Sequence, residues 1–378
     1  MRVLLTLGRL PKALDIARAL AAAGCEVIVA EPFAWHLTRL SRSVARCVQV
    51  PAPNDDEQAY HEALLALVER ERVQLIVPVS DETMHVGALH AMLPSTTRLF
   101  CPPQPSLLAL HDKLEFIRVA AAAGLPVPRT CEAVDYSQAK ALLAATRCIS
   151  KPRYSSAGKG LVDHPQGAEP LTQAPDAAPR IYQEYLPGEE LSTFGVVRRG
   201  ELVANVTYRG LIMSGTVAVS FERVSQAPDG LDEWVRAFAQ ATMHDGFLSF
   251  DFRLDQAGQP LPMECNPRAT SGVHFLTPQG LADVILGVAP LESSGLRPEA
   301  RLQQFYPSLT EVQSSFLRGH RFPGRLKLLF GVRDVTWQAD DPWPLLLQPF
   351  ASTSILWRTV LKGWTFGEAA TFDIAWGE

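Results

Sequence analysis

Two carboxylates and an amide occupy alternate positions of two short segments in the middle of the chain. Ser249 and Asp251 alternate with apolar residues in the first segment, and Glu264 and Asn266 do so in the second. Alternation with a period of two is typical of β-strands that bury one face. A loop with an even number of residues would place Asp251 opposite Glu264 and Ser249 opposite Asn266, whereas an odd loop would pair polar with apolar residues.

Facing carboxylates repel each other across a β-ladder, so a cation is expected between them. Carboxylate and amide oxygens suit Mg²⁺, with Mn²⁺ as an alternative. The expected ligands are therefore Asp251, Glu264 and Asn266. Pro267 ends the second strand and Arg268 follows it, and a planar guanidinium beside a metal is a natural phosphate partner. Taken alone, the hairpin fits equally well an ordinary surface hairpin with an acidic outer face.

Composition limits the classes of protein to consider. The chain has 378 residues, of which 47% are hydrophobic and 20% charged, which allows two or three globular domains. A net charge of -5 argues against a nucleic-acid or anionic-membrane binder. No apolar run is long enough for a secretory signal or a membrane span. The six scattered cysteines indicate reduced thiols, and we expect a cytoplasmic protein.

Residues 2–105 alternate between apolar strands and amphipathic helices, which predicts a parallel, doubly wound sheet. Polar residues 80–82 follow an expected strand at the edge where such sheets bind ligands. Asp81 there contacts a substrate or caps the next helix, and we favour the cap. The expected strands are 3–6, 27–30, 46–50, 75–79 and 98–101, and the expected helices are 11–23, 57–72 and 82–92.

The first strand-to-helix turn tests a dinucleotide-binding alternative. Residues 7–11 hold one glycine, where a dinucleotide fingerprint requires G-x-G-x-x-G. Glu31, at the end of the second expected strand, would hold a ribose in a dehydrogenase. Without the glycines, a scaffold that lends one wall to a substrate site is the better interpretation.

Cations follow in positions that suit phosphate groups. Asp112 is expected to cap a helix, which places Lys113 in its first turn, where the helix dipole disfavours a cation. A nearby anion would offset that penalty, although a solvated lysine fits equally well. Lys151 ends a strand before the small-residue loop 155–160, whose backbone amides suit an anion. This loop lacks the Walker spacing, and its alternative is an ordinary glycine-containing turn.

These features occur in an order that resembles the ATP-grasp superfamily across roughly residues 105–290. The segment 264–268 (Glu-Cys-Asn-Pro-Arg) is its most specific match, supported by residues 112–113, 151–152 and 184–190. The resemblance implies an α/β and α+β multidomain protein, in which a Rossmann-like parallel sheet precedes a two-lobed ATP-grasp fold with antiparallel sheets. The expected domains are 1–105, 106–290 (lobes about 112–182 and 183–290) and a C-terminal region, 291–378, without assigned chemistry.

The resemblance also implies individual roles. Lys113 and Lys151 would contact the α- and β-phosphates of ATP, and Glu190 the ribose. Asp251, Glu264 and Asn266 would hold Mg²⁺, and Arg268 would stabilise the transferring phosphoryl group. The implied flap and adenine residues are Ser155, Ser156, Gly158, Lys159, Gly160, Gln183, Glu184, Tyr185 and Leu186.

Members of this superfamily mostly join a carboxylate to an amine through an acyl phosphate, so the resemblance implies an ADP-forming ligase of small molecules. Arg223 is expected to hold an acceptor carboxylate, and His274 is expected to act as a base or merely to pack near the metal loop. The implied catalytic set is Arg268, Lys151, Arg223 and His274. No nucleic acid or membrane partner is expected, and a homodimer is compatible with the sequence.

Three alternatives stay open: a non-catalytic ATP-binding protein, an NAD-dependent oxidoreductase using the N-terminal domain, and an enzyme that phosphorylates a substrate without forming a C–N bond. The C-terminal region holds five of the seven tryptophans. That much aromatic surface predicts that the tryptophans are buried or cap another surface. The alternating residues 371–376 predict an added strand.

Overall fold

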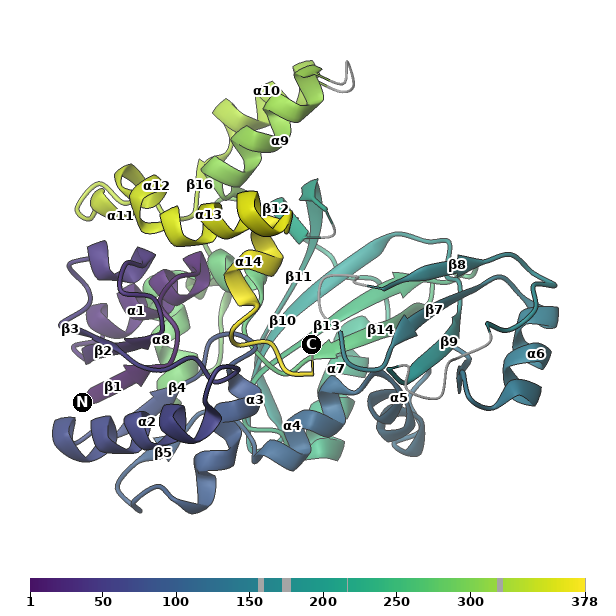
Figure 1. The fold of residues 1–378 in the computed structure, drawn as a ribbon, viewed down its shortest axis with the longest axis horizontal. Helices are drawn as coiled ribbons and strands as arrows, with labels where there is room; N and C mark the ends of the chain where they lie inside the picture. The colour runs from purple at the N-terminus through teal and green to yellow at the C-terminus, as the bar shows by residue number, and fades with distance from the viewer. Residues whose placement is uncertain (156–159, 172–177, 216, 318–321, 378) are drawn as a thin grey trace.

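The computed structural model describes residues 1–155, 160–171, 178–215, 217–317 and 322–377. Its N-terminal part is the predicted parallel sheet, and its strands have the order β3-β2-β1-β4-β5 (Figure 1). Its elements are β1 (Arg2–Leu5), α1 (Pro11–Ala22), β2 (Glu26–Glu31), η1 (Leu37–Leu40), β3 (Arg46–Gln49), α2 (Glu57–Glu71), β4 (Leu75–Val77), α3 (Thr83–Val86), η2 (Gly87–Ala91) and β5 (Arg98–Leu99).

Both faces of this sheet are covered. Val3 and Leu5 point into a core shared with α1, whereas Leu4 points into a core shared with α2. All three side chains are fully buried, as expected for a parallel sheet between layers of helices. Helix α8 (Pro278–Leu286), from a distant part of the chain, packs on α1 and ties this layer to the rest of the molecule.

A smaller antiparallel sheet, with the order β6-β9-β7-β8, lies at the far end of the molecule (Figure 1). The side chain of Asp112 accepts the backbone amides of Leu114 and Glu115, so it is the N-cap that the sequence predicts. The elements are α4 (Gln104–His111), α5 (Lys113–Ala122), β6 (Thr130–Glu132), α6 (Tyr136–Ala145), β7 (Cys148–Pro152), β8 (Val162–His164) and β9 (Arg180–Glu184).

A seven-stranded sheet, β14-β13-β10-β11-β12-β15-β16, forms the centre. The turn from β10 to β11 uses Arg199 and Gly200, both with positive φ, as tight hairpins require. Trp234 and Phe238 of α7 stack on each other and pack against Phe250 of β13. The elements are β10 (Glu190–Arg198), β11 (Glu201–Ser214), β12 (Val217–Arg223), α7 (Leu231–Thr242), β13 (Gly246–Leu254), β14 (Pro260–Asn266), η3 (Ser271–Phe275), η4 (Ser293–Gly295), β15 (Arg301–Gln303) and β16 (Arg333–Asp334).

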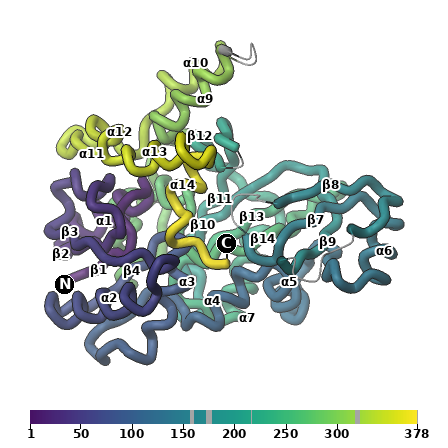
Figure 2. Tube along the Cα trace, in the orientation of Figure 1, coloured from purple at the N-terminus to yellow at the C-terminus, as the bar shows by residue number. Residues whose placement is uncertain are grey.

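The C-terminal region is mostly helical, and α9 and α10 project from the body as a pair (Figures 1 and 2). Of the two alternatives for its tryptophans, burial is wrong for Trp337, Trp343 and Trp357, which are exposed. No described helix is both long and apolar enough to span a bilayer. The helices are α9 (Phe305–Leu317), α10 (Phe322–Gly331), α11 (Trp343–Leu346), α12 (Gln348–Ala351), α13 (Thr353–Lys362) and α14 (Phe366–Thr371).

The predicted strand at residues 371–376 is also wrong. A capping box between Thr365 and Glu368 starts helix α14, which runs to Thr371, and no strand follows in the described tail. Asp373 instead turns inward to a buried ion pair with Arg9. The alternating pattern of residues 371–376 therefore reflects how an irregular tail packs on the N-terminal domain.

Candidate nucleotide and metal site

Strands β13 and β14 pair in the register that the sequence predicts. Asp251 lies opposite Glu264 and Ser249 opposite Asn266, and a bulge follows Asp251. The alternate residues Phe250 and Cys265 point into a buried core. Burial of that apolar face fixes the register, because a slip by one residue would turn the carboxylates into the core.

The two facing carboxylates have opposite electrostatic environments. Burial and the charge of Glu264 raise the pKa of Asp251 to about 8. Burial would raise the pKa of Glu264 as well, but Lys113 and Lys151 outweigh burial and lower it to about 2. The pair therefore shares a proton in the metal-free protein, and a divalent cation would allow both groups to ionise.

The donor set fits a hard cation. The Ser192 hydroxyl donates to Asp251 Oδ1 at 2.6 Å, and Asn266 Nδ2 donates to Asp251 Oδ2 at 3.1 Å. This amide orientation leaves the side-chain carbonyl oxygen of Asn266 for another partner. Within the described residues, no group of three or more His, Cys, Asp or Glu side chains gathers as a metal site. Two carboxylates and an amide oxygen nevertheless fit Mg²⁺, because this ion usually takes its remaining ligands from water molecules or phosphate groups.

Two lysines from different elements converge on the hairpin. Lys113, in the first turn of α5, lies with Nζ 3.5 Å from Glu264 Oε2 and donates to the Ser155 carbonyl at 2.5 Å. Lys151, on β7, donates to Gln183 Oε1 at 2.9 Å and to the Met263 carbonyl at 2.8 Å. Both lysines are buried, so the interpretation of Lys113 as a solvated lysine is wrong. Burial lowers the pKa of Lys151 to about 8.

Arg268 is held by a partner from the N-terminal domain. Its Nε lies 2.6 Å from Asp81 Oδ1. Burial would raise the pKa of Asp81, but Arg268 and Lys12 outweigh burial and lower it. The prediction that Asp81 caps the next helix is therefore wrong, and α3 has no side-chain cap.

The predicted flap and adenine residues lie around β7 and β9. The Ser155 carbonyl binds Lys113, and the Gly160 carbonyl accepts Arg180 at 2.6 Å. Gln183 is fully buried and bridges Lys151 to Thr130. Ser156, Gly158 and Lys159 lie outside the described residues.

Residues just beyond β9 contact arginines. Glu184 accepts Arg129 through its side chain at 2.8 Å, and the Arg147 guanidinium lies 3.9 Å from the centre of the Tyr185 ring. Arg253 joins the two ends of the turn 186–190, since it donates to the Leu186 carbonyl and to Glu190 Oε2. Of these residues, Gln183 contacts a lysine of the site, Lys151, whereas Glu184 and Glu190 are paired with Arg129 and Arg253.

Two other predicted catalytic residues contact groups outside the hairpin. His274 is 1% exposed, binds Asp15 through Nδ1 at 2.7 Å and stacks on Phe221, which ties η3 to α1. This position matches the packing alternative, and we do not retain His274 as a base. Arg223 lies at the end of β12, where its Nη2 donates to the Arg297 carbonyl at 3.2 Å.

The dinucleotide alternative fails at Glu31. This carboxylate is fully buried, accepts the backbone amides of Gly8 and Arg9, and pairs with the Arg9 side chain at 2.6 Å. Asp373 occupies the other side of the same guanidinium. A ribose at Glu31 would have to displace Arg9, which Asp373 also holds.

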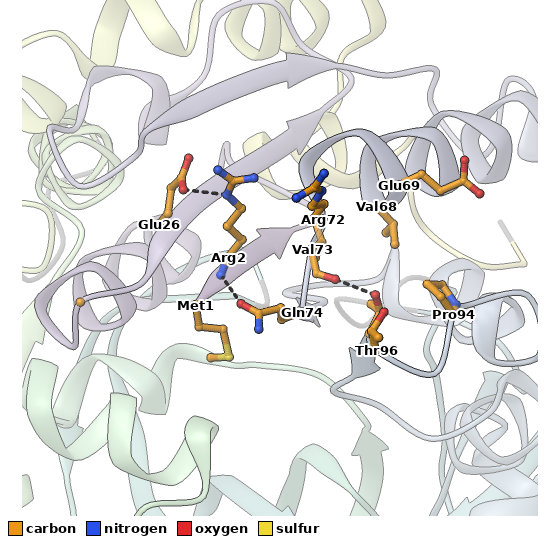
Figure 3. Close-up of a pocket in the computed structure, with 12 residues that line it drawn as sticks. Met1, Arg2, Glu26, Val68, Glu69, Arg72, Val73, Gln74, Pro94 and Thr96 are labelled. Atoms are coloured by element: carbon orange, nitrogen blue, oxygen red, sulfur yellow. Dashed lines mark hydrogen bonds and ion pairs between the residues drawn. The ribbon is translucent and has the colours of Figure 1, made fainter.

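A cavity of about 790 Å³ opens at the amino-terminal ends of the parallel strands (Figure 3). Arg2 crosses it and pairs with Glu26, while Gln74 binds the Arg2 backbone. Its described lining includes none of the predicted site residues. We therefore place the candidate site at the hairpin, where lysines and carboxylates converge.

Comparison with known proteins agrees with this geometry. The profile of a family described as "ATP-grasp domain" matches residues 110–272, which include the hairpin and both lysines. The chain contains an ATP-grasp domain. A search of curated proteins found no match.

Solved structures extend the likeness of fold beyond the ATP-grasp domain. Biotin carboxylase from Campylobacter jejuni has a TM-score of 0.62 at 16% identity, covering 79% of this chain and 74% of that chain. N5-carboxyaminoimidazole synthetase from Staphylococcus aureus has a TM-score of 0.61 at 16% identity, covering 85% and 86%. L-amino acid ligase from Bacillus licheniformis has a TM-score of 0.57 at 16% identity, covering 79% and 77%.

Several residues around the ATP-grasp domain were missed from sequence. Lys12 donates to Ser80 Oγ at 3.1 Å and to the Ala269 carbonyl at 2.7 Å, beside Arg268. Arg153 forms an ion pair with the helix cap Asp112. Neither follows from spacing, because Lys12 arrives from another domain and Arg153 reads as part of a loop.

Proposed function

We propose that this protein is an ATP-dependent ligase that activates a small-molecule carboxylate as an acyl phosphate and couples it to an amine or similar nucleophile, releasing ADP and phosphate. The observation that carries the proposal is the convergence of Lys113 and Lys151 on Glu264 and Asp251. In such a site the lysines neutralise the negative charge of a polyphosphate, and the carboxylates neutralise the positive charge of a divalent cation. It offers positioning and charge rather than a protein nucleophile, which is what phosphoryl transfer requires.

In this proposal the lysines bind the nucleotide phosphates. Lys151 and Lys113 come from different elements, so they can approach the α- and β-phosphates from two sides. Both are buried, which strengthens each contact with an anion because water competes less. The loop that contains Ser155 and Gly160 would cover the outer phosphates with its backbone amides.

The metal would be held by Asp251, Glu264 and Asn266. When bound, Mg²⁺ (or Mn²⁺ in its place) supplies positive charge to the phosphate oxygens. Ser192 orients Asp251 through its 2.6 Å hydrogen bond. We infer that the base and ribose of ATP lie along Gln183–Leu186 and Glu190, where β9 ends and β10 begins.

The carboxylate and amine substrates would bind between the N-terminal domain and the hairpin, since ligand sites favour domain interfaces. Arg268 would meet the transferring phosphoryl group and the acyl phosphate, with its guanidinium oriented by Asp81. Arg223 is assigned to the acceptor carboxylate as predicted from sequence. We place the enzyme in the cytoplasm and propose a homodimer as its assembly.

A substrate screen tests the proposal. The protein is incubated with ATP and Mg²⁺ and with pools of amino acids and small acids, and phosphate release and nucleotide products are measured. We expect ADP rather than AMP, because an acyl phosphate forms by attack on the γ-phosphate. The Glu264→Gln variant should lose turnover and keep its circular dichroism spectrum. AMP as the product, or full activity in this variant, would overturn the proposal.

Phosphorylation of a substrate without C–N bond formation is the closest rival, since the same site could serve it. The two are separated by the product: a ligase needs an amine for net turnover and consumes it in proportion to ADP. A non-catalytic ATP-binding protein would instead bind MgADP and release no phosphate with any pool.

A further inference from the structure

The C-terminal tail runs between the N-terminal domain and the ATP-grasp strands (Figures 1 and 2). Asp373 binds both terminal nitrogens of Arg9, at 2.7 and 3.0 Å, and both side chains are buried. Asn54 donates its side-chain amide to the carbonyls of Phe372 and Ala375. Together with the buried Ile374, these contacts fix the path of the tail as far as Ala375.

Beyond Ala375 the tail contacts both the N-terminal domain and the smaller antiparallel sheet. The Trp376 ring lies 4.8 Å from the ring of His85 in α3. Gly377 lies so close to Tyr154 that a Cβ added to the glycine would be 3.1 Å from Tyr154 Cβ. The tail therefore joins the N-terminal domain to the base of the loop that begins at Ser155.

These two neighbours border the proposed reaction site. His85 follows Asp81, the partner of Arg268, by four residues. Tyr154 lies with its ring 6.0 Å from the ring of His111. Burial and the charge of Lys113 lower the pKa of His111 to about 4, and Asp81 and Arg268 also act on it. Tyr154 and His111 thus lie between the end of the tail and the groups that handle phosphate and substrate.

We propose that residues 373–377 form the outer wall of the acceptor site, and that Trp376 determines specificity by packing against an apolar or planar group of the amine substrate. The inference rests on the ligase function proposed above. The Trp376 ring, which is partly exposed beside the buried His85, offers such a group a surface to pack on. The same wall excludes water, which would otherwise hydrolyse an acyl phosphate before the amine attacks.

The anchor and the wall are separate parts of the tail. Asp373 and Ile374 hold the segment in place, whereas Trp376 and Gly377 contact His85 and Tyr154. A change at Trp376 can therefore alter the wall while the anchor stays intact. Trp357, on α13, is 65% exposed and serves as a matched tryptophan control.

The test compares wild type, Trp376→Ala, a variant that ends at Ala375, and Trp357→Ala. MgADP affinity is measured by calorimetry, and ATP hydrolysis is measured without an acceptor and with each of the twenty amino acids. Trp376→Ala and the shortened variant should keep MgADP affinity within about twofold and raise acceptor-independent hydrolysis by about fivefold or more, because water gains access to the acyl phosphate site. Trp357→Ala should match wild type.

The same two variants should also show a changed preference among amino acids, with the largest loss for acceptors that have apolar or aromatic side chains. Unchanged hydrolysis and unchanged preference, with wild-type MgADP affinity, would overturn the role of the tail and leave the ligase proposal intact. If the wild-type protein does not bind MgADP, the ligase proposal fails, and the inference about the tail fails with it.

Discussion

Replacing Asp251 by Asn should stabilise the metal-free protein and weaken its binding of magnesium nucleotide. The carboxyl group has an ordinary pKa of 3.8 and a folded-state pKa of about 8, raised by burial and by Glu264. At pH 7 the folded protein must therefore bind a proton that the unfolded chain lacks. That difference corresponds to roughly 4 kcal/mol at most.

The expected gain is smaller than this limit, because Asp251 is partly exposed and titrates together with Glu264. We expect the Asn variant to raise the free energy of unfolding by about 1–3 kcal/mol at pH 7. Asn keeps a carbonyl oxygen for the Ser192 hydroxyl, so the local hydrogen bond survives. The same change removes a metal ligand and should weaken MgADP binding.

The pH dependence gives the sign of the effect. A carboxyl group whose pKa is raised in the folded state makes no difference below the unfolded pKa, and destabilises increasingly as pH rises toward the folded value. The stability advantage of Asp251→Asn should therefore grow between pH 4 and pH 8. Urea unfolding in EDTA at several pH values measures it, with the exposed Asp229→Asn as the control. A variant less stable than wild type, or an advantage that shrinks with pH, would refute this reasoning.

Three further changes have defined outcomes. Lys151→Met should weaken MgADP binding in calorimetry by about tenfold or more, because a charged hydrogen-bond donor to phosphate is lost; an affinity equal to wild type would remove Lys151 from the site. Arg268→Lys should keep MgADP affinity within about twofold and lower turnover by about a hundredfold, because Lys lacks the paired N–H donors of a planar guanidinium. Normal turnover in steady-state kinetics would contradict the role of Arg268. Asp373→Asn should lower the free energy of unfolding by about 3 kcal/mol, because it leaves Arg9 with a single buried partner; chemical denaturation with no change would contradict that value.

Local patterns were sufficient to predict the N-terminal sheet and the hairpin. Strands of a parallel sheet are continuous apolar runs, and the hairpin alternates apolar and polar residues with a period of two. Both patterns are visible within a few consecutive residues. The positions of Asp251 and Glu264 follow directly from that alternation. The cap at Asp112 is likewise a local interaction between adjacent residues.

Contacts between distant segments could not be predicted in the same way. Asp81 was expected to cap a helix, but its partner Arg268 lies 187 positions away in the sequence. His274 was expected to act as a base or merely to pack, and the sequence could not show that its packing partner is Asp15 of α1. In the tail, the alternation of residues 371–376 resembles a strand, yet Asp373 is drawn to Arg9 across the whole length of the chain. Ion pairs of this kind leave no periodic signal.

The most direct test of the proposed function is a crystal structure of the protein with Mg²⁺ and a non-hydrolysable ATP analogue. We predict that the triphosphate lies between Lys113, Lys151 and the β13–β14 hairpin, with the metal on Asp251 and Glu264. A nucleotide bound at another place, with both carboxylates free of metal, would contradict the account.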